Sequence, residues 1–173
     1  MSHRLIGDPA SLSALAASLR RTALLLRNDA EQMAPALEDS AAGWTGPVAM
    51  TTRRRTAAVI DSLESVADAL DSCARSLQRA ATDLASSAAD LRAIEEQAAT
   101  AGFEVREGRL MRAWGITGVA DGSAEHDGDR LREGLQDRLH QLLTTMGRQR
   151  SRLAADCRDA TLLLTEASSA LRA

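Results

Sequence analysis

Apolar residues recur every three or four positions along most of the chain, and this spacing predicts long amphipathic helices. Asp8-Pro9 is a helix-start signal, because the carboxylate can accept unpaired N–H groups and proline at the first helical position loses no hydrogen bond. The glycines and proline of Gly43-Trp44-Thr45-Gly46-Pro47 then end the first helix and begin a second. The first apolar stripe consists of Leu12, Leu15, Leu19, Ala23, Leu26, Ala30, Met33 and Leu37.

The second helix carries a stripe whose steps alternate between four and three residues. Such a period of 3.5 predicts a left-handed coiled-coil seam, and Ser87 is its one polar position. At 1.5 Å per residue this helix would be roughly 80 Å long, which predicts a rod. A similar stripe from Leu131 to Leu171 predicts a third helix. The second stripe consists of Val59, Leu63, Val66, Leu70, Cys73, Leu77, Ala80, Leu84, Ser87, Leu91, Ile94 and Ala98.

Between the second and third helices the pattern changes to alternation around Glu107-Gly108. This is typical of a short β-hairpin that pairs Val105 with Leu110. The glycine-rich stretch from Trp114 to Gly128 is then expected to be a loop.

The sequence therefore predicts an all-α fold, a long antiparallel helical hairpin or coiled-coil rod. We expect a three-helix bundle at one end and a small β-hairpin at the distal tip. The predicted elements of this single elongated domain, 1–173, are helices over 9–41, 47–101 and 123–172, a turn over 42–46, and the β-hairpin with its loop over 102–122.

Folding the chain on paper at these turns predicts its register. A first reversal near residue 45 places Leu19 beside Leu70, and a second near residue 114 places Cys73 opposite Cys157. The two cysteines would form either a disulfide or a pair of thiols packed as small apolar side chains. Because the first helix reaches only half of the second, Leu84, Leu91 and Ile94 are expected to need a partner chain or a self-dimer for full burial.

The amino-acid composition and the net charge disfavour several classes of binding partner. The chain has 45% apolar residues, one Phe, two Trp and no Tyr, and a net charge of −3 without a basic face or an acidic tail. Nucleic acid and anionic membranes are therefore disfavoured as partners. No stretch is apolar for long enough to span a membrane, and charges near the N-terminus argue against a signal peptide.

No catalytic motif is recognisable, and the three histidines are widely separated, so we expect no enzyme activity, no metal site and no cofactor. Arg53-Arg54-Arg55 is the one basic run, and it is expected to lie on a solvated helix face.

Trp44-Thr45-Gly46, between two amphipathic helices, resembles the turn of the WXG-motif helical-hairpin proteins of bacterial type VII secretion, the early-secreted-antigen-like family. Residues 5–100 look like that hairpin. The resemblance implies that Trp44 and Gly46 form a recognition turn that acts with a second motif, Tyr-x-x-x-Asp/Glu. The nearest match here is Phe103 to Glu107, with Phe in place of Tyr. The 66 residues after Glu107 make the chain similar to enlarged hairpin domains of type VII substrates.

The resemblance implies a non-enzymatic substrate or accessory protein of type VII secretion, exported without a signal peptide. Its expected partners are the secretion machinery and a small helical-hairpin protein or a second copy of this chain. Two alternatives stay open: a cytoplasmic chaperone or adaptor for a larger secreted toxin, and a structural coiled coil that self-associates. The predicted β-hairpin and the Trp114 loop would form the specificity surface.

Overall fold

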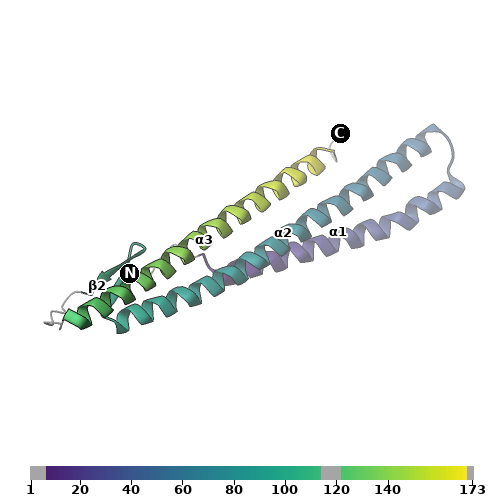
Figure 1. Cartoon of the computed structure of the whole chain (residues 1–173). Coiled ribbons are helices and arrows are strands. Elements are labelled where there is room, and N and C mark those ends of the chain that lie inside the picture. Colours follow the sequence, from purple (N-terminus) through teal and green to yellow (C-terminus); the bar gives the residue numbers. More distant parts are fainter. Residues whose placement is uncertain (1–6, 114–121, 171–173) are drawn as a thin grey trace. The chain divides into compact units, whose positions relative to one another are not determined.

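The structure is a computed structural model that describes residues 7–113 and 122–170 (Figure 1). It confirms an all-α fold of three helices with one antiparallel β-hairpin. The third helix begins at Gly122 and includes Gly128, so the predicted loop is too long at that end, and Trp114 lies outside the described residues. The elements are α1 (Pro9–Gly43), α2 (Pro47–Thr100), β1 (Phe103–Arg106), β2 (Arg109–Arg112) and α3 (Gly122–Ala170).

The chain divides into two compact units, and α2 and α3 each contribute to both. The three-helix unit consists of Ala10–Ala81 and Arg152–Ala173. The β-hairpin unit consists of Met1–Pro9 and Thr82–Ser151.

The core of the three-helix unit contains side chains from α1, α2 and α3, which confirms a three-helix bundle in this part of the chain. Leu19 packs in the same cluster as Leu70, as the register predicts. The innermost contacts are made by alanines: Ala16 and Ala74 share one cluster, and Ala23 and Ala67 share the next. All four are at most 1% exposed.

This close packing corrects the predicted first stripe. Leu15 was expected to face inward but is 48% exposed, and its neighbour Ala16 is buried instead. The seven-residue spacing of Ala16, Ala23 and Ala30 turns the small side chains toward α2, which allows the two backbones to approach. Polar contacts at the edge of this interface include the ion pair of Arg27 with Asp68, at 2.7 Å.

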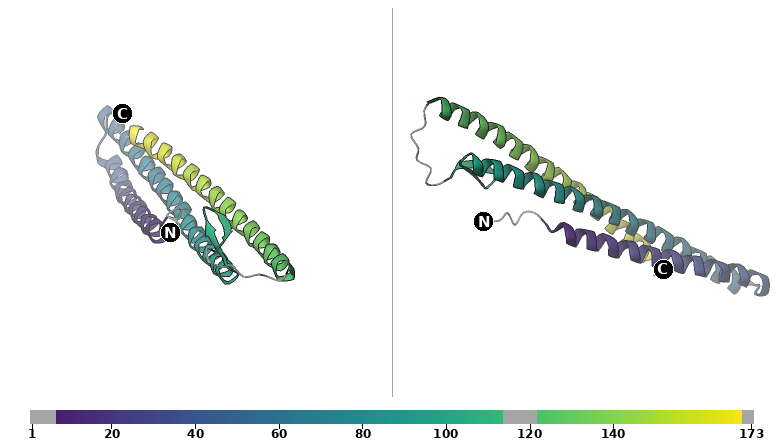
Figure 2. Two further views of the ribbon diagram at one scale, coloured as in Figure 1. Left: turned by 90° about the vertical axis from the view of Figure 1, so that its left-hand side faces the viewer. Right: turned by 90° about the horizontal axis from the view of Figure 1, so that it is seen from below.

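In the β-hairpin unit, the two strands lie against α2 and α3 (Figure 2). Val105 is paired with Leu110, as predicted, and Glu107 and Gly108 form the turn with φ angles of 52° and 78°. Two consecutive positive φ angles are characteristic of the tight turns that match the twist of a hairpin.

The inner face of the hairpin completes the core of this unit. Phe103 and Leu110 pack with Ala98 and Leu135, and Val105 packs beside Leu91, Ile94 and Leu139. Leu91 is 6% exposed and Ile94 is 2% exposed, so the expectation that they need a partner chain for burial is wrong for these two residues, whereas Leu84 is half-buried. The hairpin supplies the layer that a second chain was expected to supply.

Gln136 of α3 fixes the outer edge of β2. Its side-chain oxygen accepts a hydrogen bond from the backbone N–H of Leu110, at 2.8 Å. Its amide nitrogen donates to the backbone carbonyl of Gly108, at 3.2 Å. The pairing of β1 with β2 leaves these two backbone groups without a partner. The Gln136 side chain hydrogen-bonds both of them, as the backbone of a third strand would.

Candidate recognition site

The turn between α1 and α2 is held by its own backbone. The N–H of Trp44 donates to the carbonyl of Ser40 at 3.3 Å, and the N–H of Met50 donates to the carbonyl of Gly46 at 3.1 Å. Gly46 has a φ of 112°, and a side chain added there would meet no atom within 4 Å. Glycine is therefore required at this position by the backbone conformation and not by lack of space.

The side chain of Trp44 is 44% exposed. The guanidinium of Arg53, which lies in the second turn of α2, donates a hydrogen bond to the Trp44 carbonyl through Nη2. The Nε atom of the same guanidinium is buried and has no hydrogen-bond partner among the residues that the structure describes. The backbone of Trp44 is thus restrained through both its N–H and its carbonyl group, while part of its ring faces solvent.

Two more large apolar side chains near this turn are exposed: Val48, at 70%, and Met50, at 54%. We call Trp44, Val48 and Met50 the turn surface. Arg54 and Arg55 are also exposed, as expected for the basic run, whereas Arg53 is half-buried and bonded to Trp44. The turn surface is therefore an exposed apolar patch with cationic groups close to it in sequence, a composition suited to protein contacts.

Phe103 and Glu107 occupy different environments. Phe103 lies in β1 with its ring buried to 6% exposure, whereas Glu107 is exposed in the hairpin turn. Residues four positions apart share a face on a helix, but here the first is in a strand and the second in a turn. The role of these two residues as an export motif stays a prediction, and in this structure only Glu107 offers an accessible side chain.

The two cysteines lie together in the three-helix unit. Cys73 packs in the cluster that contains Leu77 and Leu153, and its thiol is close enough to Cys157 for the two groups to interact. Burial raises the pKa of the Cys73 thiol, and Cys157 and the Asp156 carboxylate raise it further. Both cysteines are free thiols in this structure, so the predicted placement is observed without the disulfide.

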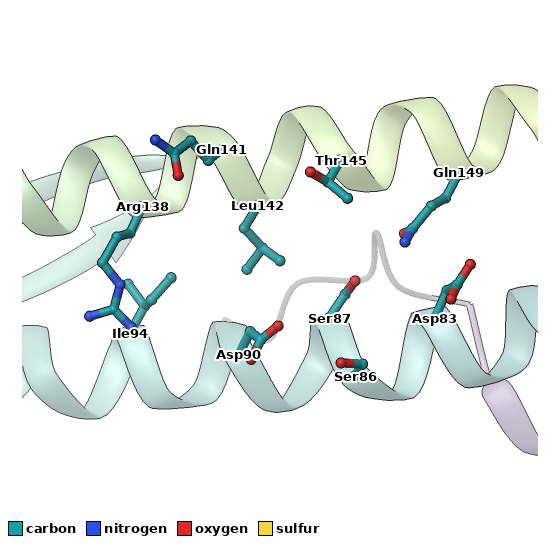
Figure 3. Close-up of a pocket in the computed structure, with 10 residues that line it drawn as sticks. All are labelled: Asp83, Ser86, Ser87, Asp90, Ile94, Arg138, Gln141, Leu142, Thr145 and Gln149. Atoms are coloured by element: carbon teal, nitrogen blue, oxygen red, sulfur yellow. The ribbon is translucent and has the colours of Figure 1, made fainter.

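A polar groove of about 410 Å³ lies between α2 and α3 in the β-hairpin unit (Figure 3). It opens beside Ser87, the polar position of the predicted seam, where a leucine would have filled the space. Asp83 and Asp90 line it from α2, while Arg138 crosses from α3 and donates to Gln97 at 2.8 Å. The lining contains hydroxyl, amide, carboxylate and guanidinium groups.

Among residues 7–113 and 122–170, no group of three or more His, Cys, Asp or Glu side chains is placed to hold a metal ion. In the same part of the chain, no helix combines the length and the apolar character needed to cross a membrane.

Comparison of the chain with protein-family models, with curated proteins and with solved structures finds no match. The features of the chain that bear on function are therefore the geometry of the turn surface and the sequence resemblance of Trp44-Thr45-Gly46.

Proposed function

We propose that this chain is a non-enzymatic substrate or accessory protein of a type VII secretion system, and that it acts through protein–protein contacts. The observation that carries the proposal is the half-exposed ring of Trp44 on the restrained turn between α1 and α2. Tryptophan is the residue type most enriched among side chains that dominate binding energy, and its apolar ring gains from burial against a partner.

The restrained backbone supports this role. Hydrogen bonds with Ser40 and Arg53 already fix the backbone N–H and the backbone carbonyl of Trp44. Binding a partner therefore needs little further ordering of the turn. Gly46 contributes the positive φ that allows the chain to reverse before α2 begins. We assign Trp44 to contact with the secretion machinery and Gly46 to the shape of the turn.

In the β-hairpin unit, we assign the second contact to the outer face of the hairpin. Glu107 presents a carboxylate at its turn, and Met111 is 52% exposed on β2. Phe103 contributes indirectly, since its buried ring anchors the hairpin to Ala98 and Leu135.

The second candidate function is a chaperone or adaptor that holds a larger secreted protein and stays in the cytoplasm. It is favoured by exposed leucines in the three-helix unit: Leu24 and Leu25 on α1 are 63% and 64% exposed, and Leu162 on α3 is 63% exposed. Leucines at this exposure could bind an amphipathic helix of another chain, such as a small helical-hairpin protein.

An export assay in the native host separates the two functions. The tagged protein is measured in culture filtrate and in lysate, with and without a functional type VII motor ATPase, and a cytoplasmic enzyme serves as a marker for lysis. Appearance in the filtrate only with the active motor supports the proposal. Complete retention in the lysate of both strains contradicts it and favours the chaperone, whose cargo would then be sought by pull-down.

A further inference from the structure

The register between α2 and α3 places Cys73 opposite Cys157. In the three-helix unit, Leu77 and Leu153 share one core cluster with Cys73, and Val66 and Leu164 share the next. The two helices are antiparallel, so residue numbers rise along α3 as they fall along α2. Position 157 of α3 therefore faces position 73 of α2, between the Leu77–Leu153 level and the Val66–Leu164 level. The interaction of the two thiols agrees with this register.

A disulfide between these two sulfur atoms needs an S–S distance of about 2.05 Å and β-carbons about 3.8 Å apart. The antiparallel helices on either side of the cysteine pair are held by apolar contacts that include Leu77 and Leu153. The geometry therefore suits a bond within one chain better than a bond between two chains.

We propose that Cys73 and Cys157 are a redox modification site, which a small-molecule disulfide converts into an intramolecular disulfide between α2 and α3. One cysteine thiolate attacks the reagent and releases its first thiolate, which leaves a mixed disulfide on the protein. The second cysteine thiolate then attacks the protein sulfur atom and releases the other half of the reagent. Two electrons pass from the cysteines to the reagent, and the two thiol protons end on the two released thiols.

Burial and the neighbouring Cys157 raise the pKa of the Cys73 thiol, which lowers its thiolate fraction at a given pH. Both cysteines are half-buried. The inference does not depend on the proposed export, because it uses only contacts within the three-helix unit.

The disulfide would strengthen a specific part of this unit. Its ion pairs Arg27–Asp68 and Arg20–Asp71 both join α1 to α2. The contribution of α3 to its core clusters is apolar, through Leu153 and Leu164. A covalent link closing a loop of roughly 80 residues therefore fixes α3 to the helical hairpin, and it is expected to raise the melting temperature by about 10 °C.

The test uses the wild-type chain incubated with oxidised glutathione, followed by thiol titration and tryptic mapping without reductant. We expect both thiols to be consumed, no covalent dimer to form, and the peptides 56–75 and 153–158 to be linked. The gain in melting temperature should disappear after reduction with a phosphine. Glutathione retained on one cysteine, a covalent dimer, or two thiols that stay titratable would each overturn the proposal.

A positional control keeps the test specific. In the double variant C157S/D156C, the second thiol moves by one residue, which rotates it by about 100° around α3. We expect its intramolecular disulfide to form at least about tenfold more slowly than that of the wild type. Equal rates would show that the facing positions of Cys73 and Cys157 do not direct the reaction.

Discussion

Replacement of Gln136 by alanine is predicted to loosen the β-hairpin without unfolding the chain. The Gln136 side chain makes two hydrogen bonds to the backbone of the hairpin turn and β2, at 2.8 and 3.2 Å. Each contributes about 1 kcal/mol net, so the variant should lose about 2 kcal/mol of local stability, on the order of 30-fold in the opening equilibrium. The effect should be concentrated at Leu110, whose N–H loses its acceptor in a residue that is only 6% exposed.

Amide hydrogen exchange followed by NMR measures this opening residue by residue. The Leu110 amide should exchange about 30-fold faster in Q136A than in the wild type. The Ala113 amide, which donates to the carbonyl of Gly102 at 2.9 Å, should change less because it keeps its partner. Gln141→Ala is the matched control, since Gln141 is exposed on the same helix and lines the groove instead. Unchanged exchange at Leu110 in Q136A would refute the reasoning.

Three further substitutions test the packing, each by a thermal melt followed by circular dichroism. Leu77→Asp should unfold the three-helix unit, because Leu77 is 4% exposed and a buried charge there has no partner; an unchanged melt would contradict the bundle. Ala74→Leu should cost about 1–3 kcal/mol, because Ala74 packs directly against Ala16 with 0% exposure; a stabilised variant would show that the helices are not in close contact. Gly108→Ala should cost about 1–2 kcal/mol, because Gly108 has a φ of 78° and its added Cβ would lie 3.1 Å from Leu143 Cδ1; a neutral effect would argue against this turn geometry.

The sequence predicts most of the fold because the strongest signals are local. The Glu107-Gly108 pair predicts the turn, and the alternation around it predicts that Val105 faces Leu110. The glycines and proline around Trp44 predict where α1 ends and α2 begins. The heptad spacing, together with the positions of the two reversals, also predicts the facing of Cys73 and Cys157.

The sequence-based predictions fail where packing between distant segments, and not the local spacing of apolar residues, decides which side chains are buried. A stripe chosen by large side chains favours Leu15 over Ala16, although close helix contact needs the smaller residue inside. The burial of Leu91 depends on where the β-hairpin lies, which no local spacing encodes. Gln136 was missed because a glutamine on an otherwise polar helix face gives no sign that it pairs with a backbone 26 residues away.

The sequence predicted the position of the turn around Trp44 but not the exposure or the contacts of its side chains. The sequence indicates a turn at Trp44, while the exposure of its ring and its hydrogen bond with Arg53 follow only from the structure. For Phe103 the pattern suggested half of a surface motif, and the structure buries the ring because β1 turns it toward α2 and α3.

The most direct test of the central claim is export of Trp44→Ala compared with Leu25→Ala in a host with an active type VII motor. Leu25 is the matched control, since it is an apolar residue of the same helical hairpin and is 64% exposed. If Trp44 is the recognition residue, W44A should remain in the lysate at wild-type abundance and melting temperature, while L25A should reach the culture filtrate. Export of W44A at the wild-type level would contradict the assignment of the turn as a recognition site.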